Sequence, residues 1–427
     1  MSRVIVIGGG AAGMMAAYTA AANGNAVTLL EKNEKLGKKI YITGKGRCNF
    51  TNACDFETFQ NNIVTNPKFM FSSLKAFTPQ DMIDFLENAG CATKVERGNR
   101  AFPLSDHASD VTAAIHRKMK EVGVKVELNT EVLDISKVEP EGDAEAAFTA
   151  PRFQLSCKSL KDGKRRVYGA DSVIVATGGL SYPSTGSTGD GYQFAESFGL
   201  KNNPCNAALV PLNTAEKDYE ELQGVSLKNV SVRMWADERK KPIMDTEPGE
   251  LLFTHFGLSG PLILSASSIA AGYMQKGSSL RLEMDLKPAL TEEMLDARIL
   301  RDFEEARNMN ISNALGKLLI SSLRPVVLRR AGIDPEKKVR DITREERVKL
   351  VEVVKHMDYH ITGTRGYNEA IVTHGGIAVS EINPKTMECK KVPGLYFVGE
   401  VLDVDAFTGG FNLQIAWSTG VAAGNAV

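Results

Sequence analysis

The strongest constraint on the fold of this chain lies at its N-terminus, where residues 3–31 read RVIVIGGGAAGMMAAYTAAANGNAVTLLE. Residues 4–7 form an unbroken apolar run, which is typical of a parallel strand buried on both faces. Gly8, Gly10 and Gly13 follow in a G-x-G-x-x-G pattern. Glycines at these places make a tight turn, let a pyrophosphate approach the backbone and let a helix pack against the strand.

The residues after these glycines complete the pattern. Residues 11–22 are rich in Ala and Met and predict a helix, and residues 26–30 predict a second strand with Glu31 at its end. The helix start would face the phosphates and the acid would accept the ribose hydroxyls, so the order predicts a dinucleotide-binding βαβ unit. A glycine-rich turn without a ligand is the alternative. The predicted contacts to the cofactor are Gly8, Gly10, Ala12, Gly13 and Glu31.

Composition excludes several classes of protein. The 427 residues are 43% hydrophobic and 24% charged, which indicates a soluble globular protein. A net charge of -1 provides no basic field, so we expect no nucleic-acid partner. No apolar run approaches the ~20 residues that span a bilayer, so we expect no membrane association. The six cysteines form no CxxC pair, which indicates free thiols in the cytoplasm and no metal site.

The loop after Glu31 distinguishes this chain from a simple dinucleotide domain, where a second helix would follow soon. It carries four cations near the predicted pyrophosphate, Lys38, Lys39, Lys45 and Arg47, and two glycines that let the backbone bend close to a ligand. A ligand-binding loop is our interpretation. The alternative is a solvated basic loop.

The rest of the chain predicts a split domain with an insert. Residues 170–177 predict an apolar strand that ends at two further glycines, Thr188 and Asp190 could cap a helix from about Gly191, and the acidic residues 139–150 predict a surface loop. Residues 204–363 predict a β-barrel-like insert domain of short strands, with a helical subdomain at about 291–357 and a break near Pro325. The expected fold is α/β, with a Rossmann-like domain made of residues 1–203 and 364–427.

Five stretches together resemble one family. They are VIVIGGGAAG (4–13), EKNEKLGKKIYITGKGRCN (31–49), ATGGLSYPSTGSTGDGY (176–192), LLFTHFGLSGP (251–261) and GLYFVGEVLDVDAFTGGFNLQIAWSTG (394–420). In combination they resemble the YhiN-like or BaiN-like FAD-dependent oxidoreductases of bacteria, which include aminoacetone oxidases and 3-dehydro-bile-acid reductases. The resemblance implies FAD as cofactor and a two-part FAD domain with a barrel-like insert.

The resemblance also implies which residues contact FAD. At the ADP half it adds Lys32, Lys38 and Val132 to the five N-terminal contacts. At the flavin half it implies Gly46, Arg47, Cys48, Asn49, Thr177, Gly178, Gly179, Gly399, Glu400, Asp403, Gly409, Gly410, Asn412, Leu413 and Gln414. The last of these begin a helix below the pyrimidine ring, where the partial positive charge favours a reduced anionic flavin by up to ~2 kcal/mol.

Two chemistries remain open for such an enzyme. The first is NADH- or NADPH-linked reduction of a C=C bond conjugated to a ketone, as in a 3-oxo-Δ4 steroid or bile acid, and the second is oxidation of a small amine such as aminoacetone with O2. No second complete GxGxxG unit is present, so a nicotinamide would bind in an unusual way or only transiently. Leu251, Leu252, Phe253 and Leu258 could form a wall for a bulky apolar small molecule, which favours the first chemistry slightly. The alternative is that they are the core of the barrel.

Five side chains are candidates for contact with substrate: Tyr182, His255, Arg365, Tyr367 and His374. The enone reaction needs an anchor for a carbonyl oxygen and a proton donor, which these residue types can supply. Each has a plain structural alternative, as a core histidine, an interface ion pair or a packed aromatic ring. A protein that binds flavin or RNA without catalysis is the alternative of a different class. The sequence leaves the oligomeric state open.

Overall fold

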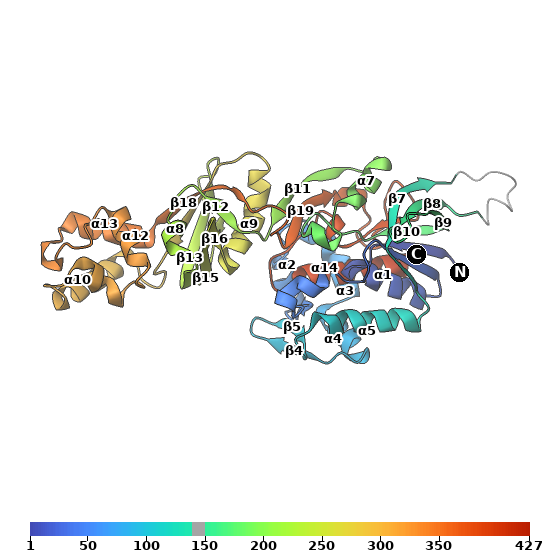
Figure 1. The fold of residues 1–427 in the computed structure, drawn as a ribbon, viewed down its shortest axis with the longest axis horizontal. Helices are drawn as coiled ribbons and strands as arrows, with labels where there is room; N and C mark the ends of the chain where they lie inside the picture. The colour runs from blue at the N-terminus through green and yellow to red at the C-terminus, as the bar shows by residue number, and fades with distance from the viewer. Residues whose placement is uncertain (139–149) are drawn as a thin grey trace. The chain divides into compact units, whose positions relative to one another are not determined.

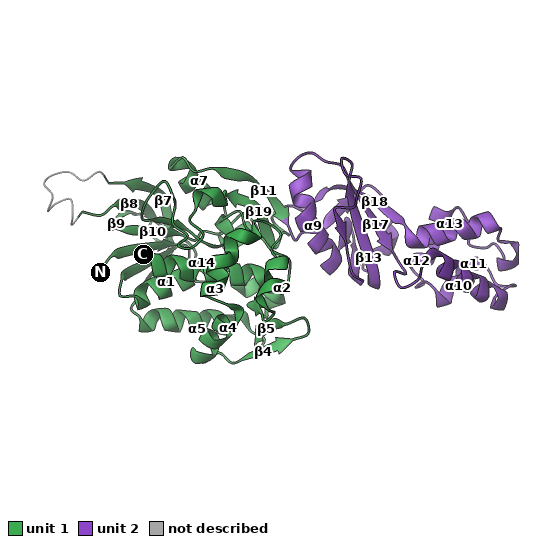
Figure 2. Ribbon diagram, turned by 180° about the vertical axis from the view of Figure 1, so that it is seen from behind, with its two compact units in different colours: residues 1–207, 367–427 green, residues 208–366 purple. Residues whose placement is uncertain are grey.

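The computed structural model describes residues 1–138 and 150–427, and its chain divides into two compact units (Figure 2). Unit 1 contains Met1–Ala207 and Tyr367–Val427, and unit 2 contains Ala208–Gly366. Each unit has a buried apolar core of its own. The acidic loop predicted at 139–150 lies, but for its last residue, outside the described residues.

Unit 1 is built on a five-stranded parallel sheet with the strand order β20-β10-β1-β2-β6. Its strands are β1 (Arg3–Ile7), β2 (Ala26–Glu31), β6 (Lys125–Leu128), β10 (Ser172–Val175) and β20 (Leu395–Phe397). The four residues of β10 are all buried, as expected for a strand covered on both faces. Strands from the start, the middle and the end of the chain therefore share one sheet.

Two apolar helices from opposite ends of the chain pack against each other in unit 1: α1 (Ala11–Ala22) and α14 (Phe411–Ala426), side by side in Figure 1. Small residues make this approach possible. A Cβ on Gly420 would lie 2.4 Å from the carbonyl oxygen of Ala12, and one on Gly424 would lie 2.8 Å from that of Ala16. The two helices thus join the N-terminal and C-terminal segments of unit 1 into one core.

The remaining elements of unit 1 surround this sheet. The helices are α2 (Phe56–Asn61), α3 (Phe71–Ala76), α4 (Pro79–Asn88), α5 (Ala108–Glu121) and α7 (Asp190–Ser197), with short 3-10 turns at η1 (Ile40–Gly46), η2 (Pro67–Met70), η3 (Pro183–Thr185), η6 (Val379–Glu381) and η7 (Gly399–Val401). Small sheets are formed by β3 (Thr51–Asn52), β5 (Arg100–Pro103) and β4 (Thr93–Glu96), by β7 (Thr130–Lys137), β8 (Phe153–Ser159) and β9 (Arg165–Ala170), and by β11 (Asn202–Ala208) and β19 (Val372–Ile377).

Unit 2 contains a seven-stranded antiparallel sheet in which β13 pairs with β14, β15 and β17, so that the sheet closes on itself. The strands are β12 (Leu212–Thr214), β13 (Ser226–Ala236), β14 (Met244–Asp245), β15 (Gly249–Thr254), β16 (Gly257–Ser259), β17 (Leu280–Asp285) and β18 (Met357–Thr364). Buried and less buried residues alternate along most of β13, which places Val230, Val232, Met234 and Ala236 in the core.

Helices complete unit 2. They are α8 (Tyr219–Leu222), α9 (Pro261–Met274), α10 (Glu292–Glu305), α11 (Ile311–Ala314), α12 (Leu323–Ala331) and α13 (Arg344–Lys355), with 3-10 turns at η4 (Leu315–Lys317) and η5 (Val339–Asp341). The predicted helix break at Pro325 is wrong in position, because α12 begins at Leu323 and contains the proline in its first turn. Proline is tolerated there, since the first-turn N–H groups have no partner within the helix.

The expected fold class is confirmed: a parallel Rossmann-like sheet and a separate closed antiparallel sheet are both present. None of the described helices combines the length and the apolar character that crossing a membrane requires.

Candidate cofactor and active site

The turn between β1 and α1 has the close packing that its glycines predict. Gly8 has a φ of +101° and a Cβ there would lie 2.5 Å from the carbonyl oxygen of Ala176, while a Cβ on Gly13 would lie 1.9 Å from that of Gly8. Gly10 is the N-cap of α1, and a Cβ built on it would have no atom within 4 Å. No side chain caps this helix start and no acid lies in its first turn, so its N–H groups remain available for an anion.

Glu31 organises the same turn from the end of β2. Its buried carboxylate accepts the N–H of Gly9 at 2.6 Å and both the backbone N–H and side-chain amide of Asn33 at 2.7 Å. A carboxylate has about four lone-pair positions, so these three bonds leave room for one ribose hydroxyl. Glu31 is therefore a support of the turn in addition to its predicted contact with the ribose.

Most cations of the loop after β2 have carboxylate partners within unit 1. Lys32 pairs with Asp190 at 2.6 Å, and Lys38 lies 3.3 Å from Glu34. The Arg47 guanidinium is held by Glu96 and Asp106 and lies 4.2 Å from the centre of the Phe102 ring. Among the residues that the structure describes, Lys45 makes no ion pair. Because most of these side chains pair with carboxylates of the protein, the structure does not support the interpretation that all four cations face a pyrophosphate. The predicted contacts of Lys32, Lys38 and Arg47 with FAD stay predictions.

The pairing of Lys32 also explains a wrong prediction about α7. Lys32 Nζ lies 2.5 Å from the hydroxyl of Thr188, and that hydroxyl donates to Asp190 at 2.7 Å. Gly189, with a φ of +87°, is the N-cap, and no side chain caps the helix. Thr188 and Asp190 therefore bind the lysine that directly follows β2 and do not cap the helix.

The GKGRCN loop, which consists of residues 44–49, buries the Cys48 side chain and the side-chain oxygen of Asn49. Cys48 is fully buried with a φ of 60°, and burial raises the pKa of its thiol to about 12. Asn49 Oδ1 and, beyond β10, Thr177 Oγ1 are buried side-chain oxygens without a hydrogen-bond partner among the described residues. Buried polar atoms in a native structure normally have partners. These two orphans, with the open space over Gly10, fit a polar cofactor lying along this edge.

The remaining predicted contacts of the first segment lie in several elements of unit 1. Gly178 and Gly179 follow Thr177, and a Cβ on Gly179 would lie 2.4 Å from the hydroxyl of Thr373. Val132 is buried on β7, and Gly46 ends η1. Ala12 is buried in the first turn of α1.

Glu400 is held in a buried network in unit 1. Its carboxylate lies 2.7 Å from Lys39 Nζ, accepts the hydroxyl of Ser181 at 2.6 Å and accepts the N–H of Thr373 at 2.9 Å. Burial alone would raise the pKa of Glu400, but Lys39 and these donors outweigh burial and lower it. The sequence reasoning missed Ser181 and Thr373. The network ties the loop after β2, the loop after β10 and β19 to the start of η7.

The start of α14 forms a second glycine turn. Gly410 is the N-cap with a φ of +99°, and a Cβ there would lie 2.4 Å from the carbonyl oxygen of Thr51. The Asn412 side chain donates to and accepts from the backbone of Ala406, and the Gln414 carbonyl accepts the hydroxyl of Thr51 at 2.6 Å. Because these side chains hold the surrounding loops, only backbone N–H groups of this helix start remain for a ligand.

The other predicted contacts near this turn also have structural partners. Gly399 donates its N–H to the Thr419 hydroxyl at 3.0 Å, and Asp403 accepts from the side chains of Asn66 and Asn203. Gly409 accepts from Asn52 at 3.0 Å, and Leu413 is half-buried in the first turn of α14.

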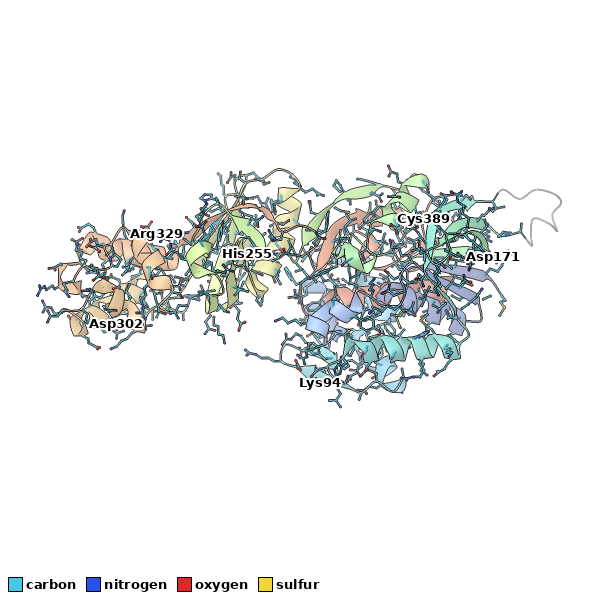
Figure 3. All side chains as sticks on the ribbon, in the orientation of Figure 1. Lys94, Asp171, His255, Asp302, Arg329 and Cys389 are labelled. Carbon is cyan, nitrogen blue, oxygen red and sulfur yellow. The ribbon has the colours of Figure 1, made fainter. Side chains whose placement is uncertain are left out.

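The five candidate catalytic residues fall into two groups. Tyr182, Tyr367 and His374 lie in unit 1, where the N–H of Tyr182 donates to the carbonyl of Tyr367 at 2.9 Å. His255 and Arg365 lie in unit 2, where both contact Phe256. The ring centres of His255 and Phe256 are 4.8 Å apart, and the Arg365 guanidinium lies 4.3 Å from the centre of the Phe256 ring. His255, labelled in Figure 3, is exposed, which excludes its reading as a core histidine.

The structure changes the interpretation of the predicted apolar wall and adds partners to His374. Leu251, Phe253 and Leu258 are fully buried in the core of unit 2, so they do not form a wall for a bulky substrate. His374 contacts Asp405 and Thr65, which the sequence reasoning missed. An acid inside the otherwise apolar stretch VDAF was the signal that could have identified Asp405.

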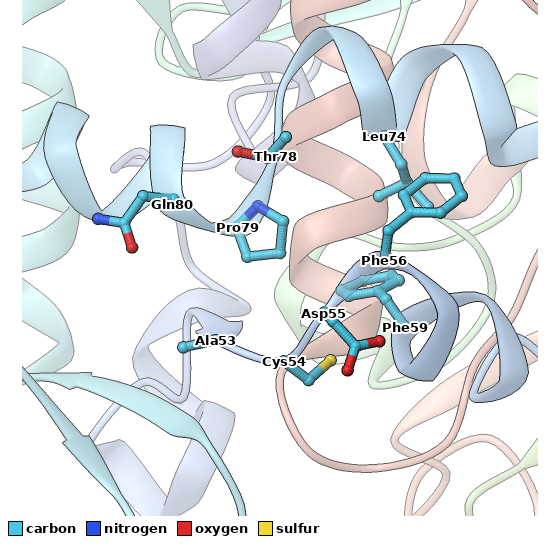
Figure 4. Close-up of a pocket in the computed structure, with 9 residues that line it drawn as sticks. All are labelled: Ala53, Cys54, Asp55, Phe56, Phe59, Leu74, Thr78, Pro79 and Gln80. Atoms are coloured by element: carbon cyan, nitrogen blue, oxygen red, sulfur yellow. The ribbon is translucent and has the colours of Figure 1, made fainter.

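A pocket of about 300 Å³ opens in unit 1 between the segment that follows β3, helices α2 and α3, and the start of α4 (Figure 4). It is lined by Ala53, Cys54, Asp55, Phe56, Phe59, Leu74, Thr78, Pro79 and Gln80. Asp55 and Thr78 use their side chains as helix N-caps, and Gln80 donates to Asp84. The pocket wall is therefore mainly apolar.

A parallel sheet whose first helix begins at an uncapped glycine turn, with an acid closing the second strand, defines a dinucleotide-binding protein. The chain belongs to the family described as HI0933-like protein Rossmann domain, whose model matches residues 2–426. The protein is an FAD-dependent oxidoreductase, and the family resemblance suggested by its motifs is confirmed.

Among the relatives that match this chain are three that are covered over nearly their whole length. The ribosomal RNA dihydrouridine synthases of Escherichia coli (strain K12) and Haemophilus influenzae are 33% and 32% identical, over 97% and 99% of this chain and 95% and 97% of their own. The 3-dehydro-bile acid delta(4,6)-reductase of Clostridium scindens is 30% identical, over 100% of this chain and 99% of its own.

Proposed function

We propose that this enzyme reduces a carbon–carbon double bond conjugated to a carbonyl, with NADH or NADPH as electron donor. The observation that supports this proposal is the chemistry shared by the activities of the three relatives described above. A 3-oxo bile acid with a Δ4 double bond is an enone. Dihydrouridine is uridine whose C5=C6 bond, conjugated to the C4 carbonyl, is saturated. Both reductions add a hydride to the β-carbon and a proton to the α-carbon.

The residues of unit 1 supply what such a reaction requires from the protein. Bound FAD, once reduced, would supply the hydride. Gly10 and the uncapped first turn of α1 would bind its pyrophosphate, and Glu31 its ribose. The uncapped start of α14 would stabilise negative charge on the pyrimidine ring. The Lys39–Glu400 network would hold the surrounding loops in place.

Two substrate classes fit this chemistry. A 3-oxo-Δ4 steroid or bile acid is favoured by one relative, and a uridine of ribosomal RNA is favoured by two, with identities of 30% against 32% and 33%. The net charge of -1 and the pairing of Lys32 and Arg47 mean that an RNA backbone would need other cations. The burial of Leu251, Phe253 and Leu258 removes the earlier argument for a bulky apolar substrate. We therefore propose the reduction of a conjugated double bond, and an experiment must decide between the steroid and the uridine as substrate.

The experiment supplies the purified yellow protein anaerobically with NADH or NADPH and either a 3-oxo-Δ4 steroid or ribosomal RNA from a strain that lacks this enzyme. Mass spectrometry then measures the saturated steroid or dihydrouridine. Saturation of either substrate supports the proposed reaction and identifies its class.

A third arm tests amine oxidation with aminoacetone and O2. Hydrogen peroxide from this arm, with neither double bond reduced under either nicotinamide, would overturn the reductase in favour of the oxidase.

A further inference from the structure

The reaction proposed above needs an acid, because the α-carbon must receive a proton after the hydride has reached the β-carbon. We propose that His374, held in place by Asp405, is this acid; the inference rests on the proposed function. Thr65 and Asp405 are positioning residues, and His374 is the residue that would touch the reacting carbon.

The geometry of the pair is that of an oriented imidazole. His374 Nδ1 lies 3.1 Å from Asp405 Oδ1 and 3.3 Å from the hydroxyl of Thr65. Asp405 is fully buried, whereas 16% of the His374 side chain is exposed. Nε2 has no hydrogen-bond partner among residues 1–138 and 150–427. A histidine bound at one ring nitrogen and open at the other is a typical proton donor.

Both members of the pair lie on segments that shape the predicted cofactor site. Thr373, next to His374, accepts the N–H groups of Leu180 and Ser181, which follow the glycines after β10. Asp405 precedes Ala406, whose backbone is bound on both sides by Asn412 in the first turn of α14. The imidazole is therefore anchored between two glycine turns where a flavin ring is expected.

The electrostatics suit an acid. Burial would lower the pKa of His374, but its bond to Asp405 and the charges of Asp405 and Asp403 outweigh burial and raise the pKa. A larger fraction of the imidazole is then protonated near neutral pH. Asp405 Oδ2 is buried without a hydrogen-bond partner among the described residues. At that oxygen, therefore, no donor among these residues competes with His374 for the carboxylate.

The step balances without any further reagent. The hydride arrives at the β-carbon and the π electrons of the double bond become those of an enolate. The Nε2–H bond of His374 breaks, its proton joins the α-carbon, and the carbonyl re-forms. Neutral His374 then takes a proton from water. Two electrons come from the nicotinamide named in the proposed function.

The test compares His374→Gln with His356→Gln, a matched control in unit 2. His356 is also a histidine paired with carboxylates, 2.9 Å from Glu292 and 3.1 Å from Glu283. Both variants should retain FAD and show the wild-type flavin spectrum. With pre-reduced protein, single-turnover reduction of the steroid or ribosomal RNA should fall by about 10²–10⁴-fold in His374→Gln, the usual contribution of acid catalysis. His356→Gln should leave it unchanged.

Asp405→Asn adds a measurement, the pKa of His374, that would not change if Asp405 had only a structural role. NMR titration of the His374 ring should give a lower pKa in this variant, and the loss of activity on raising pH should begin at a lower pH. Asp403→Asn, which removes the other carboxylate whose charge raises the pKa of His374, should give a smaller shift in the same direction and provides the test if Asp405→Asn does not fold. A His374→Gln variant that keeps FAD and reduces substrate within about threefold of wild type would overturn the acid. Wild-type protein that reduces neither substrate would instead overturn the proposed function.

Discussion

Glu31 shows how one residue can serve the fold and the cofactor together. Its carboxylate holds the glycine turn through Gly9 and Asn33, so Glu31→Ala would disturb the turn as well as the ribose contact. Glu31→Gln keeps the size and removes the charge. We expect this variant to lose about 1.5–3 kcal/mol of FAD binding for each hydrogen bond to the charge that is lost. FAD content after gel filtration measures the effect, and Glu121→Gln, which removes an exposed carboxylate that pairs with Lys118 in α5, is the control. Tightly held FAD in Glu31→Gln would contradict the assignment.

Cys48 lies beside the predicted flavin but lacks the properties of a redox thiol. It is fully buried, and burial raises the pKa of its thiol to about 12, so almost no thiolate exists at neutral pH. We expect Cys48→Ser to keep FAD and to keep turnover within about tenfold of wild type. Cys91→Ser, a second buried cysteine of unit 1, is the control for burying a hydroxyl. A loss above about a hundredfold with FAD still bound would restore a redox role.

At the scale of elements, the contact between α1 and α14 depends on glycine. A Cβ on Gly420 would lie 2.4 Å from the carbonyl oxygen of Ala12, so Gly420→Ala must push the two helices apart. Overpacking of this kind typically costs about 1–3 kcal/mol. We expect a lower melting temperature and weaker FAD retention. Gly363→Ala in unit 2, where the nearest atom would be 3.8 Å away, should change neither. Equal melting temperatures for both variants would show that the contact is not tight.

Sequence patterns predicted elements well where the constraint is local. The strand, glycine turn and helix at residues 3–22 follow from periodicity and glycine spacing alone, and the structure has them. Ion pairs between distant segments could not be predicted. Thr188 and Asp190 resembled a helix cap, yet they bind Lys32, which is more than 150 positions away. His374 was a candidate by residue type, but its partners Thr65 and Asp405 become neighbours only through the fold.

At the scale of the molecule, the two units should respond separately to damage. Asp218 in unit 2 is nearly buried and binds Arg329, labelled in Figure 3, at 3.2 Å and Arg330 Nε at 2.7 Å, joining α8 to α12. Removing one partner of a fully buried ion pair costs about 3–5 kcal/mol, and the exposure of the two arginines lowers that cost for Asp218. We therefore expect Asp218→Asn to lower the melting transition of unit 2.

FAD content should stay near the wild-type value in Asp218→Asn, because unit 1 has its own core. Calorimetry with a parallel measurement of flavin release separates the two transitions. Glu305→Gln, which removes an exposed ion pair with Lys317, is the control and should change little. Loss of FAD in step with unfolding of unit 2 would mean that the units are not independent.

The discontinuity of unit 1 has a consequence for how the protein is made. A ribosome synthesises residues 1–207 first, then all of unit 2, and β20 and α14 only after unit 2. Until then one edge of β10 and one face of α1 have no partner, and both are apolar. Unit 2 can fold during translation, whereas unit 1 must wait until β20 and α14 have emerged from the ribosome. The nascent chain therefore carries an incomplete, aggregation-prone surface while unit 2 is made, and FAD has a complete site to enter only after α14 has been synthesised.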